Sequence, residues 1–283
     1  MPPMSASAID LSVVIPAYNE ASRLGETLAR VLAYLERRGT TFEVLVVDDG
    51  SADNTVEVAQ EFSHRGVWVL ELARNRGKGA ALRHGVVASS GEMVLLCDAD
   101  LSTPIQESER LEPRLREADV VLGSRSVEGS RIEVHQPPHR ELMGKLFNLL
   151  IRLLGFGAFK DTQCGFKLLR GEVARELFPV LGVERFAYDV ELVWEAQRRG
   201  LRIVEVGVEW HNSPVSRVRP WQDAPQMFMD VLRIRFGRRP TPTPLPPGRP
   251  AARVRIPEAA TLRPEGASAA DTPRAESTTH RAR

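Results

Sequence analysis

In Met93-Val-Leu-Leu-Cys-Asp-Ala-Asp100, an apolar run ends in an acidic triplet. The run from Met93 to Leu96 predicts a short buried strand. Carboxylates at the end of such a strand are costly unless a cation neutralises them, and Mg²⁺ or Mn²⁺ prefers oxygen ligands of this kind. We therefore expect Asp98 and Asp100 to hold a divalent metal. The alternative is a pair of solvated aspartates that cap a helix near Pro104.

Short apolar segments alternate with helical patterns over the first two-thirds of the chain. The predicted strands cover residues 11–15, 44–47, 67–70, 93–96 and 120–122. Farther along, residues 189–199 predict a helix and residues 203–210 a strand. This alternation predicts an α/β fold with a mostly parallel sheet that is covered by helices on both faces. Ligands bind at the carboxyl ends of the strands in such sheets, and three polar clusters fall there: residues 16–20, 48–51 and 98–100.

The composition restricts the class of protein. The 283 residues are 42% hydrophobic, which suits one α/β domain with appendages, and the formal net charge of +1 argues against a nucleic-acid binder. Two cysteines, Cys97 and Cys164, do not make a disulfide framework, so we expect a reducing, cytoplasmic setting. We find no signal-peptide pattern at the N-terminus and no apolar run of the roughly 20 residues that a spanning helix needs. The protein is expected to be soluble or peripheral to a membrane.

Three segments are predicted from composition and pattern. Residues 1–9 form a flexible N-terminus, residues 10–237 form the domain, and residues 238–283 form a disordered tail, because nine of the 20 prolines lie there. Within the domain, residues 142–156 predict an amphipathic helix with Lys145 and Arg152 on one face. Such a helix suits the membrane interface, although a core or dimer helix would show the same pattern.

Two loops accompany the acidic triplet. In Asp48-Asp49-Gly50-Ser51, one aspartate could accept a hydrogen bond from a nucleobase imide while the other orients loop amides. A capped turn would explain Gly50 and Ser51 but not the two acids before them. In the basic loop of residues 74–79, the amides and Lys78 could meet a phosphate. This loop lacks the P-loop spacing, and no G-x-G-x-x-G follows the first strand, which counts against a nicotinamide-dependent dehydrogenase.

Taken together, these motifs resemble those of the family-two glycosyltransferases. The matching segments, in the family's order, are Ser12–Glu20, Val46–Ser51, Arg76–Gly79, Asp98–Asp100 and Gly123–Arg125. Residues 161–167 (DTQCGFK) and 185–192 (RFAYDVEL) are similar to the dolichyl-phosphate β-glucosyltransferase branch. The resemblance covers residues 10–237 and implies a GT-A type fold. It also implies inverting transfer of a hexose from a UDP- or GDP-sugar to a lipid phosphate.

The resemblance further implies roles for individual residues. The nucleotide-sugar contacts that it implies are Pro16, Ala17, Tyr18, Glu20, Asp49, Asp98, Ala99 and Gln163. Asp49 matches the base-recognising acid, whereas Arg125 matches a position that meets a phosphate. Arg217, after Ser216, resembles a cation that faces the diphosphate. Ser102 stands where many relatives carry a glutamine that helps to bind the metal.

A lipid phosphate acceptor changes what the site must supply. A phosphate monoester has a second pKa near 6, so at neutral pH it is mostly a dianion that attacks without a base. A hydroxyl acceptor would need a general base. Asp189 lies where relatives that use hydroxyl acceptors place that base, and we expect it instead to orient the sugar or the acceptor loops; a helix N-cap is the alternative. Arg125, Arg131 and Arg140 could position the acceptor phosphate.

These observations lead to one prediction of function. We expect Asp100, Asp189, Arg125 and Arg217 to serve the transfer of glucose from UDP-glucose to a polyprenyl phosphate, with Mg²⁺ or Mn²⁺, at the inner face of the membrane. The alternatives are GDP-mannose as the donor, a soluble hydroxyl acceptor, or a nucleotide-sugar-binding protein without turnover. No nucleic-acid partner is expected.

Overall fold

The computed structural model describes residues 9–134, 144, 149, 151, 154–155, 159–212, 220–237 and 240–244. All of them belong to one compact unit, residues 1–253. The predicted disordered tail lies outside the described residues apart from positions 240–244, and the predicted helix 142–156 lies outside them apart from five positions. Arg140, Ser216 and Arg217 also lie outside them.

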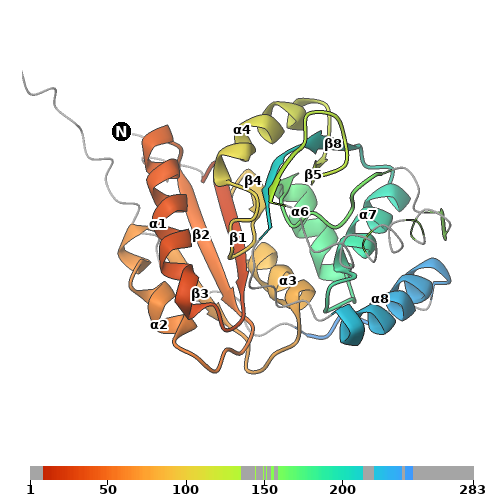
Figure 1. The fold of residues 1–283 in the computed structure, drawn as a ribbon, viewed down its shortest axis with the longest axis horizontal. Helices are drawn as coiled ribbons and strands as arrows, with labels where there is room; N and C mark the ends of the chain where they lie inside the picture. Colours follow the sequence, from red (N-terminus) through yellow and green to blue (C-terminus); the bar gives the residue numbers. More distant parts are fainter. Residues whose placement is uncertain are drawn as a thin grey trace, which may run out of the picture. The chain divides into compact units, whose positions relative to one another are not determined.

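A seven-stranded sheet forms the centre of the unit (Figure 1). Its strands, in spatial order, are β3 (Val67–Glu71), β2 (Phe42–Asp48), β1 (Leu11–Ala17), β4 (Met93–Leu96), β7 (Lys167–Arg170), β5 (Val120–Ser124) and β8 (Ile203–Gly207). Only β7 is antiparallel to its neighbours. A second, two-stranded sheet pairs β6 (Arg131–Val134) with β9 (Glu209–His211). The predicted mostly parallel α/β fold is confirmed.

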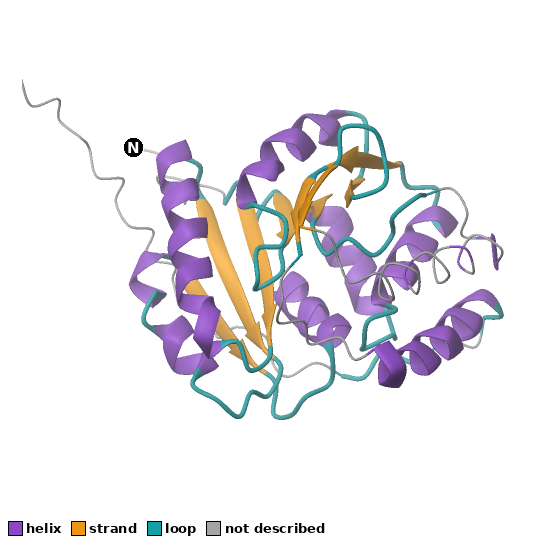
Figure 2. Ribbon diagram, viewed as in Figure 1, coloured by secondary structure: helices purple, strands orange, loops and turns teal. Residues whose placement is uncertain are grey.

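Helices lie on both faces of the large sheet (Figure 2). They are α1 (Ala21–Arg38), α2 (Thr55–Gln60), α3 (Lys78–Ala88), α4 (Ser108–Leu111), α6 (Gly171–Leu177), α7 (Tyr188–Arg198) and α8 (Pro220–Arg235). Short 3₁₀ turns occupy Ser63–Arg65, Ile105–Glu107, Glu112–Arg116 and Phe178–Val180. Within the described part of the chain, no helix is both long and apolar enough to span a membrane.

The strands separate two hydrophobic cores because their side chains alternate between the faces. In β1, Val13 and Ile15 pack with α1 in one core, whereas Val14 packs with α3 in the other. All three side chains are fully buried. The parallel strands are therefore apolar on both faces, which explains why they appear as continuous apolar runs in the sequence.

The segment predicted as one strand over residues 203–210 is two strands in two sheets, so this prediction is wrong in part. The chain changes partners at Val208, whose N–H donates to Ser124 in β5 at 3.0 Å and whose carbonyl accepts from Arg131 at 3.1 Å. The sequence of residues 203–210 gives no sign of this change, because the change depends on the hydrogen-bond partners on either side.

Residues 240–244, which the composition assigned to the tail, hydrogen-bond to the domain. Ordered contacts therefore extend beyond the predicted boundary at residue 237.

Candidate active site

Four loops meet at one edge of the large sheet because of the strand directions. β1, β2 and β4 are parallel, so the segments after Ala17, Asp48 and Leu96 leave the sheet at the same edge. β7 runs the other way between β4 and β5, with Lys167 opposite both Leu96 and Leu122. The start of β7 therefore lies at the carboxyl ends of its neighbours. This brings the segment before Lys167 to the acidic triplet, which a parallel strand in that place would not do.

The Asp98 carboxylate is paired with an ammonium from the basic loop. Lys78 Nζ lies 2.5 Å from Asp98 Oδ1. Burial alone would raise the pKa of Asp98, but the Lys78 ammonium holds that pKa below its ordinary value. Burial would likewise lower the pKa of Lys78, and Asp98 and Asp189 together keep it above its ordinary value. Both partners are therefore charged at neutral pH, and Lys78 supplies a cation at the predicted site.

Asp100 lies beside a second cation, Arg23. Arg23 Nη1 is 3.9 Å from Asp100 Oδ2, and the guanidinium also forms an ion pair with Glu20. The Ser102 N–H donates to Asp100 Oδ1 at 3.0 Å. The Thr27 hydroxyl of α1 donates to the Ala99 carbonyl at 2.7 Å, which ties the triplet to that helix. The carboxylate of Asp100 is thus fixed in place while its side chain stays 20% exposed.

Backbone strain is concentrated in two of the site loops. Among the described residues, Asn19 (φ 54°) and Leu101 (φ 46°) are the non-glycine residues with positive φ. Asn19 follows β1, and Leu101 follows the acidic triplet. This region of backbone space is costly for a side chain such as leucine, and strain of this kind gathers at binding and catalytic sites. Leu101 is therefore strained directly after the acidic triplet, whereas asparagine tolerates this conformation at Asn19.

Asp48 organises the turn after β2. Its Oδ2 accepts from the N–H groups of Gly50 (3.1 Å) and Ser51 (2.9 Å). Its Oδ1 is buried and has no hydrogen-bond partner among the described residues. Gly50 has φ 72°, and a Cβ there would lie 2.6 Å from the backbone of Arg74, so the turn packs directly on the basic loop.

Asp49 holds the basic loop by its backbone. Its Oδ1 accepts from the N–H of Arg76 at 2.7 Å, and its Oδ2 accepts from Gly77 N–H at 2.7 Å and Asn75 Nδ2 at 2.9 Å. Burial raises the pKa of this carboxyl, although these amides oppose the change. In this structure Asp49 therefore performs the loop-orienting role expected of one of the two aspartates. The base-recognising role that the resemblance implies for it stays a prediction.

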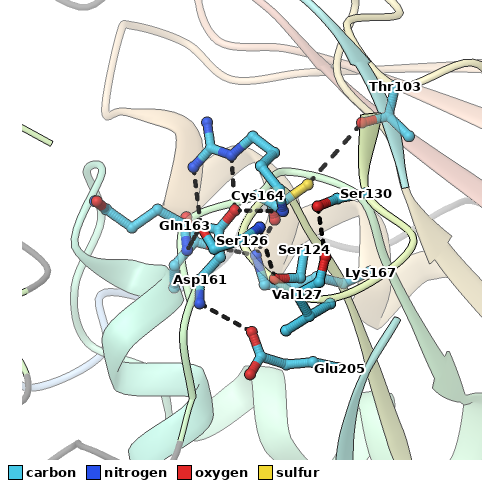
Figure 3. A network of polar contacts seen from close by, with 12 residues as sticks. Thr103, Ser124, Ser126, Val127, Ser130, Asp161, Gln163, Cys164, Lys167 and Glu205 are labelled. Carbon is cyan, nitrogen blue, oxygen red and sulfur yellow. Dashed lines mark hydrogen bonds and ion pairs between the residues drawn. The ribbon is translucent and has the colours of Figure 1, made fainter. Parts of the chain in front are cut away.

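Arg125 is fixed at the end of β5 by a carboxylate from the DTQCGFK segment. Asp161 accepts from Arg125 Nε at 2.7 Å, Nη2 at 2.9 Å and the backbone N–H at 3.0 Å. Burial would raise the pKa of Asp161, but the guanidinium lowers it. The Arg125 guanidinium also lies 5.4 Å from the Trp210 ring centroid. The pair sits in a polar network around Asp161 and Ser124, in which Glu205 accepts from the Asp161 N–H at 2.9 Å (Figure 3).

Asp189 is paired inside the protein with Lys167 of β7. Lys167 Nζ donates to Asp189 Oδ1 and to the Cys164 carbonyl, and its side chain is 1% exposed. Burial raises the pKa of Asp189, and the Lys167 and Lys78 ammoniums only partly offset this effect. The N-cap of α7 is Ala187, so the helix-cap alternative for Asp189 is wrong. The carboxylate instead serves as the counterion of a buried lysine.

The glycine of the DTQCGFK segment makes room for the triplet. A Cβ on Gly165 would lie 2.1 Å from Asp98 Oδ2, so the two segments touch at this point. Nearby, the Gln163 N–H donates to Asp161 Oδ1 at 3.2 Å. The segment that carries Gln163, a predicted nucleotide-sugar contact, therefore packs directly against the predicted metal ligand Asp98.

The structure brings most of the predicted site residues to this edge. The predicted residues that lie there are Pro16, Ala17, Tyr18, Glu20, Asp49, Lys78, Asp98, Ala99, Asp100, Arg125, Gln163 and Asp189. Three partners of site residues were not predicted from the sequence: Arg23, Lys167 and Asp161. The spacing of Arg23, three positions after Glu20 on one helix face, could have indicated that ion pair. The other two pairings join residues far apart in the sequence, and no local pattern marks them.

The donor set at the triplet suits a hard cation. Asp98 and Asp100 offer carboxylate oxygens, which Mg²⁺ and Mn²⁺ prefer. Across the part of the chain that the structure describes, no group of three or more His, Cys, Asp or Glu side chains could hold a metal ion. A cation at Asp98 and Asp100 would need ligands in addition to these two carboxylates.

Comparison with known proteins gives consistent results. The family model Glycosyl transferase family 2 matches residues 12–178. A dolichyl-phosphate beta-glucosyltransferase of Trichomonas vaginalis is 40% identical over 244 residues, which are 81% of this chain and 72% of that protein. The dolichyl-phosphate beta-glucosyltransferase of Homo sapiens is 39% identical over 242 residues, covering 80% of this chain and 75% of that protein.

A solved structure shares the fold. It is Mycobacterium tuberculosis glucosyl-3-phosphoglycerate synthase in complex with Mn²⁺, UDP and glucosyl-3-phosphoglycerate. The TM-score is 0.61 at 21% identity, and the match covers 84% of this chain and 82% of that chain. At this identity the likeness concerns the fold alone.

Proposed function

The chain belongs to glycosyl transferase family 2, and on this premise we propose that it transfers glucose from UDP-glucose to a polyprenyl phosphate such as dolichyl phosphate, with inversion. The observation that carries the proposal is the Asp98–Asp100 triplet, which lies at the carboxyl edge of the sheet beside two cations, Lys78 and Arg23. The relatives named dolichyl-phosphate beta-glucosyltransferase support the choice of sugar and acceptor.

The donor would lie across the carboxyl ends of β1, β2 and β4. The loop of residues 16–20 and the Asp48–Asp49 pair would contact the nucleoside, and the buried Asp48 Oδ1 is an acceptor without a partner among the described residues. Lys78 would exchange part of its contact with Asp98 for the diphosphate, whose charge grows as the sugar departs. A Mg²⁺ or Mn²⁺ ion held by Asp98 and Asp100 would supply Lewis-acid neutralisation of that same charge.

The acceptor assignment agrees with the state of Asp189. A general base needs an oxygen that can reach the acceptor proton, whereas Asp189 Oδ1 accepts from the buried Lys167 ammonium. A phosphate dianion needs no base. It needs a fixed cation, and the Arg125 guanidinium, held by Asp161 and still 25% exposed, fits that need. We assign Arg125 to the acceptor phosphate.

Contact with a membrane surface would let the enzyme reach a lipid-linked acceptor. The exposed apolar side chains include Leu149, Phe228, Met229 and Phe236, the last being 69% exposed. Arg233 and Arg235 lie in the last turn of α8, beside Phe236. Apolar side chains beside cations suit a surface with anionic headgroups. The free, buried Cys97 and Cys164 agree with the cytoplasmic face.

A donor panel with and without a chelator tests the proposal. We expect turnover of UDP-glucose to exceed that of GDP-mannose by at least about 100-fold, because a pocket with polar groups placed for one ligand rejects another that leaves them unpaired. Chelation should abolish turnover, and added Mn²⁺ should restore it, because the growing diphosphate charge is otherwise unbalanced. The measurement is label transfer from each sugar nucleotide to extracted polyprenyl phosphate. Preference for GDP-mannose, or full activity with chelator present, would contradict the donor or the metal assignment respectively.

A further inference from the structure

Residues 240–244 lie against the segment before α7 and against helix α3. The Thr243 hydroxyl donates to Glu184 Oε1 at 2.7 Å. The Thr243 carbonyl accepts from Arg83 Nη2, and the Pro244 carbonyl accepts from Arg76 Nη1 at 3.5 Å. The segment therefore makes three separate contacts with the domain, although its Pro- and Thr-rich sequence resembles a linker.

The buried side chain of Arg83 forms one of the contacts between the domain and this segment. Its side chain lies in α3, the residue is only 2% exposed, and Nη1 donates to the Leu181 carbonyl at 3.1 Å. Burial lowers the pKa of Arg83. A buried charged donor that loses its acceptor leaves an unsatisfied group, which is expensive. The Thr243 carbonyl is therefore one of the acceptors that satisfy this buried guanidinium.

The approach of the two backbones is close at Gly182. A Cβ built on Gly182 would lie 1.8 Å from the Pro240 carbonyl oxygen and 2.7 Å from the Pro240 carbonyl carbon. Both of these atoms belong to the backbone, so no flexible side chain could yield to a larger residue. Residue 182 must be glycine if Pro240 is to keep its position.

Glu184 connects this contact to the basic loop of the active site. Its carboxylate forms an ion pair with Arg76, and its carbonyl accepts from the Ala80 N–H at 2.9 Å. The Arg76 N–H donates in turn to Asp49, and Lys78 lies two residues farther on. Thr243 and Asp49 thus both act on Arg76. Asp49 accepts from its backbone N–H, and Thr243 contacts the Glu184 carboxylate that pairs with its guanidinium.

We propose that residues 240–244 are a brace that holds the loop of residues 75–78 in its donor-binding geometry, with Thr243 and Glu184 as positioning residues. The brace rests on the proposed function only in naming a uridine diphosphate donor as the ligand of that loop. Its physical effect is to fix Arg76 through Glu184, so that Gly77 and Lys78 meet a diphosphate already in place.

Full-length variants with matched controls test the brace. Thr243→Val removes the hydroxyl and keeps the shape, whereas Thr243→Ser keeps the hydroxyl. Gly182→Val displaces Pro240, and Gly25→Ala is its control because a Cβ there would make only an ordinary contact, 3.5 Å from Val58. The probes are hydrogen exchange of the Arg76 and Gly77 amides without ligand, and the Kd for UDP with Mn²⁺ present.

We expect Thr243→Val and Gly182→Val to speed exchange of both amides and to weaken UDP binding by about tenfold. Thr243→Ser and Gly25→Ala should match the wild type in both measurements. Unchanged exchange in Thr243→Val would overturn the brace, and this variant decides the matter if Gly182→Val does not fold. Faster exchange with unchanged UDP affinity would overturn the positioning role. If the wild type binds no UDP, the proposed donor fails, and exchange alone then decides the brace.

Discussion

The Asp100→Asn variant should lose about 100- to 1,000-fold in kcat while keeping its fold. Removal of one preorganised group that stabilises charge in a transition state typically lowers kcat by about this factor. The amide has the shape of the carboxylate, and its oxygen can still accept from the Ser102 N–H. What it lacks is the negative charge that would hold a cation against the diphosphate. The measurements are glucose transfer from labelled UDP-glucose and the thermal unfolding midpoint.

A matched control separates this effect from a general effect of charge. Glu26→Gln makes the same isosteric change at a side chain that is 79% exposed. We expect it to keep full activity, because an exposed pair such as that of Glu26 with Arg30 contributes little. Asp100→Asn should in addition require more Mn²⁺ for half-maximal rate. Wild-type turnover in Asp100→Asn would contradict the role of the Asp100 carboxylate in the transfer.

Lys167→Met should have the largest effect on stability of any single change at this edge. It removes the counterion of Asp189, and breaking a buried pair in this way costs about 3–5 kcal/mol. For a domain of this size that is a fall in Tm of roughly 10 °C. The side chains of Lys167 and Asp189 are 1% and 6% exposed, so solvent offers little compensation. The Tm at pH 7 is the measurement.

The sign of the pH dependence provides a second check on this variant. Without Lys167, the pKa of Asp189 in the folded protein rises further above its unfolded value. At high pH the unpaired Asp189 carboxylate is charged and lowers the free energy of unfolding. As the pH falls through the pKa of Asp189 in the folded protein, the carboxyl takes up a proton and this loss of stability is relieved. The stability deficit of Lys167→Met relative to the wild type should therefore shrink as the pH is lowered.

The double variant and a surface pair serve as controls. Lys167→Met with Asp189→Asn removes both charges of this buried pair, so its Tm should recover most of the loss. Arg65→Met breaks a pair whose side chains are 30% and 46% exposed, and it should cost no more than about 1 kcal/mol. A double variant as unstable as Lys167→Met would show that the two side chains do not act as a pair.

The parallel strands could be predicted from the sequence because the pattern that identifies each strand lies within that strand. Strands such as Val13–Ile15 are buried on both faces, so they appear as continuous apolar runs. Each run is followed by the polar residues that its carboxyl end presents, as at Asp98. The acidic triplet and the loop of residues 16–20 can therefore be recognised from the sequence alone.

The antiparallel strand β7 could not be predicted in this way. Its first residue, Lys167, is charged yet fully buried, which violates the ordinary pattern of a central strand. Only the tertiary structure shows that Asp189, 22 residues later, compensates the charge. Residues 240–244 were not predicted for a related reason. Two of their three contacts use backbone carbonyls, and the third joins Thr243 to the distant Glu184, so composition carries no information about them.

An assay with two kinds of acceptor distinguishes transfer to a lipid phosphate from transfer to a hydroxyl group. The full-length protein is incubated with labelled UDP-glucose, Mn²⁺ and vesicles that contain dolichyl phosphate, beside a reaction that contains only water-soluble hydroxyl acceptors, and the label is counted after phase separation. We predict glucose in the organic phase, dependent on dolichyl phosphate and lost in Asp100→Asn. Label that appears only in a water-soluble product would contradict the lipid phosphate acceptor, and with it the assignment of Arg125.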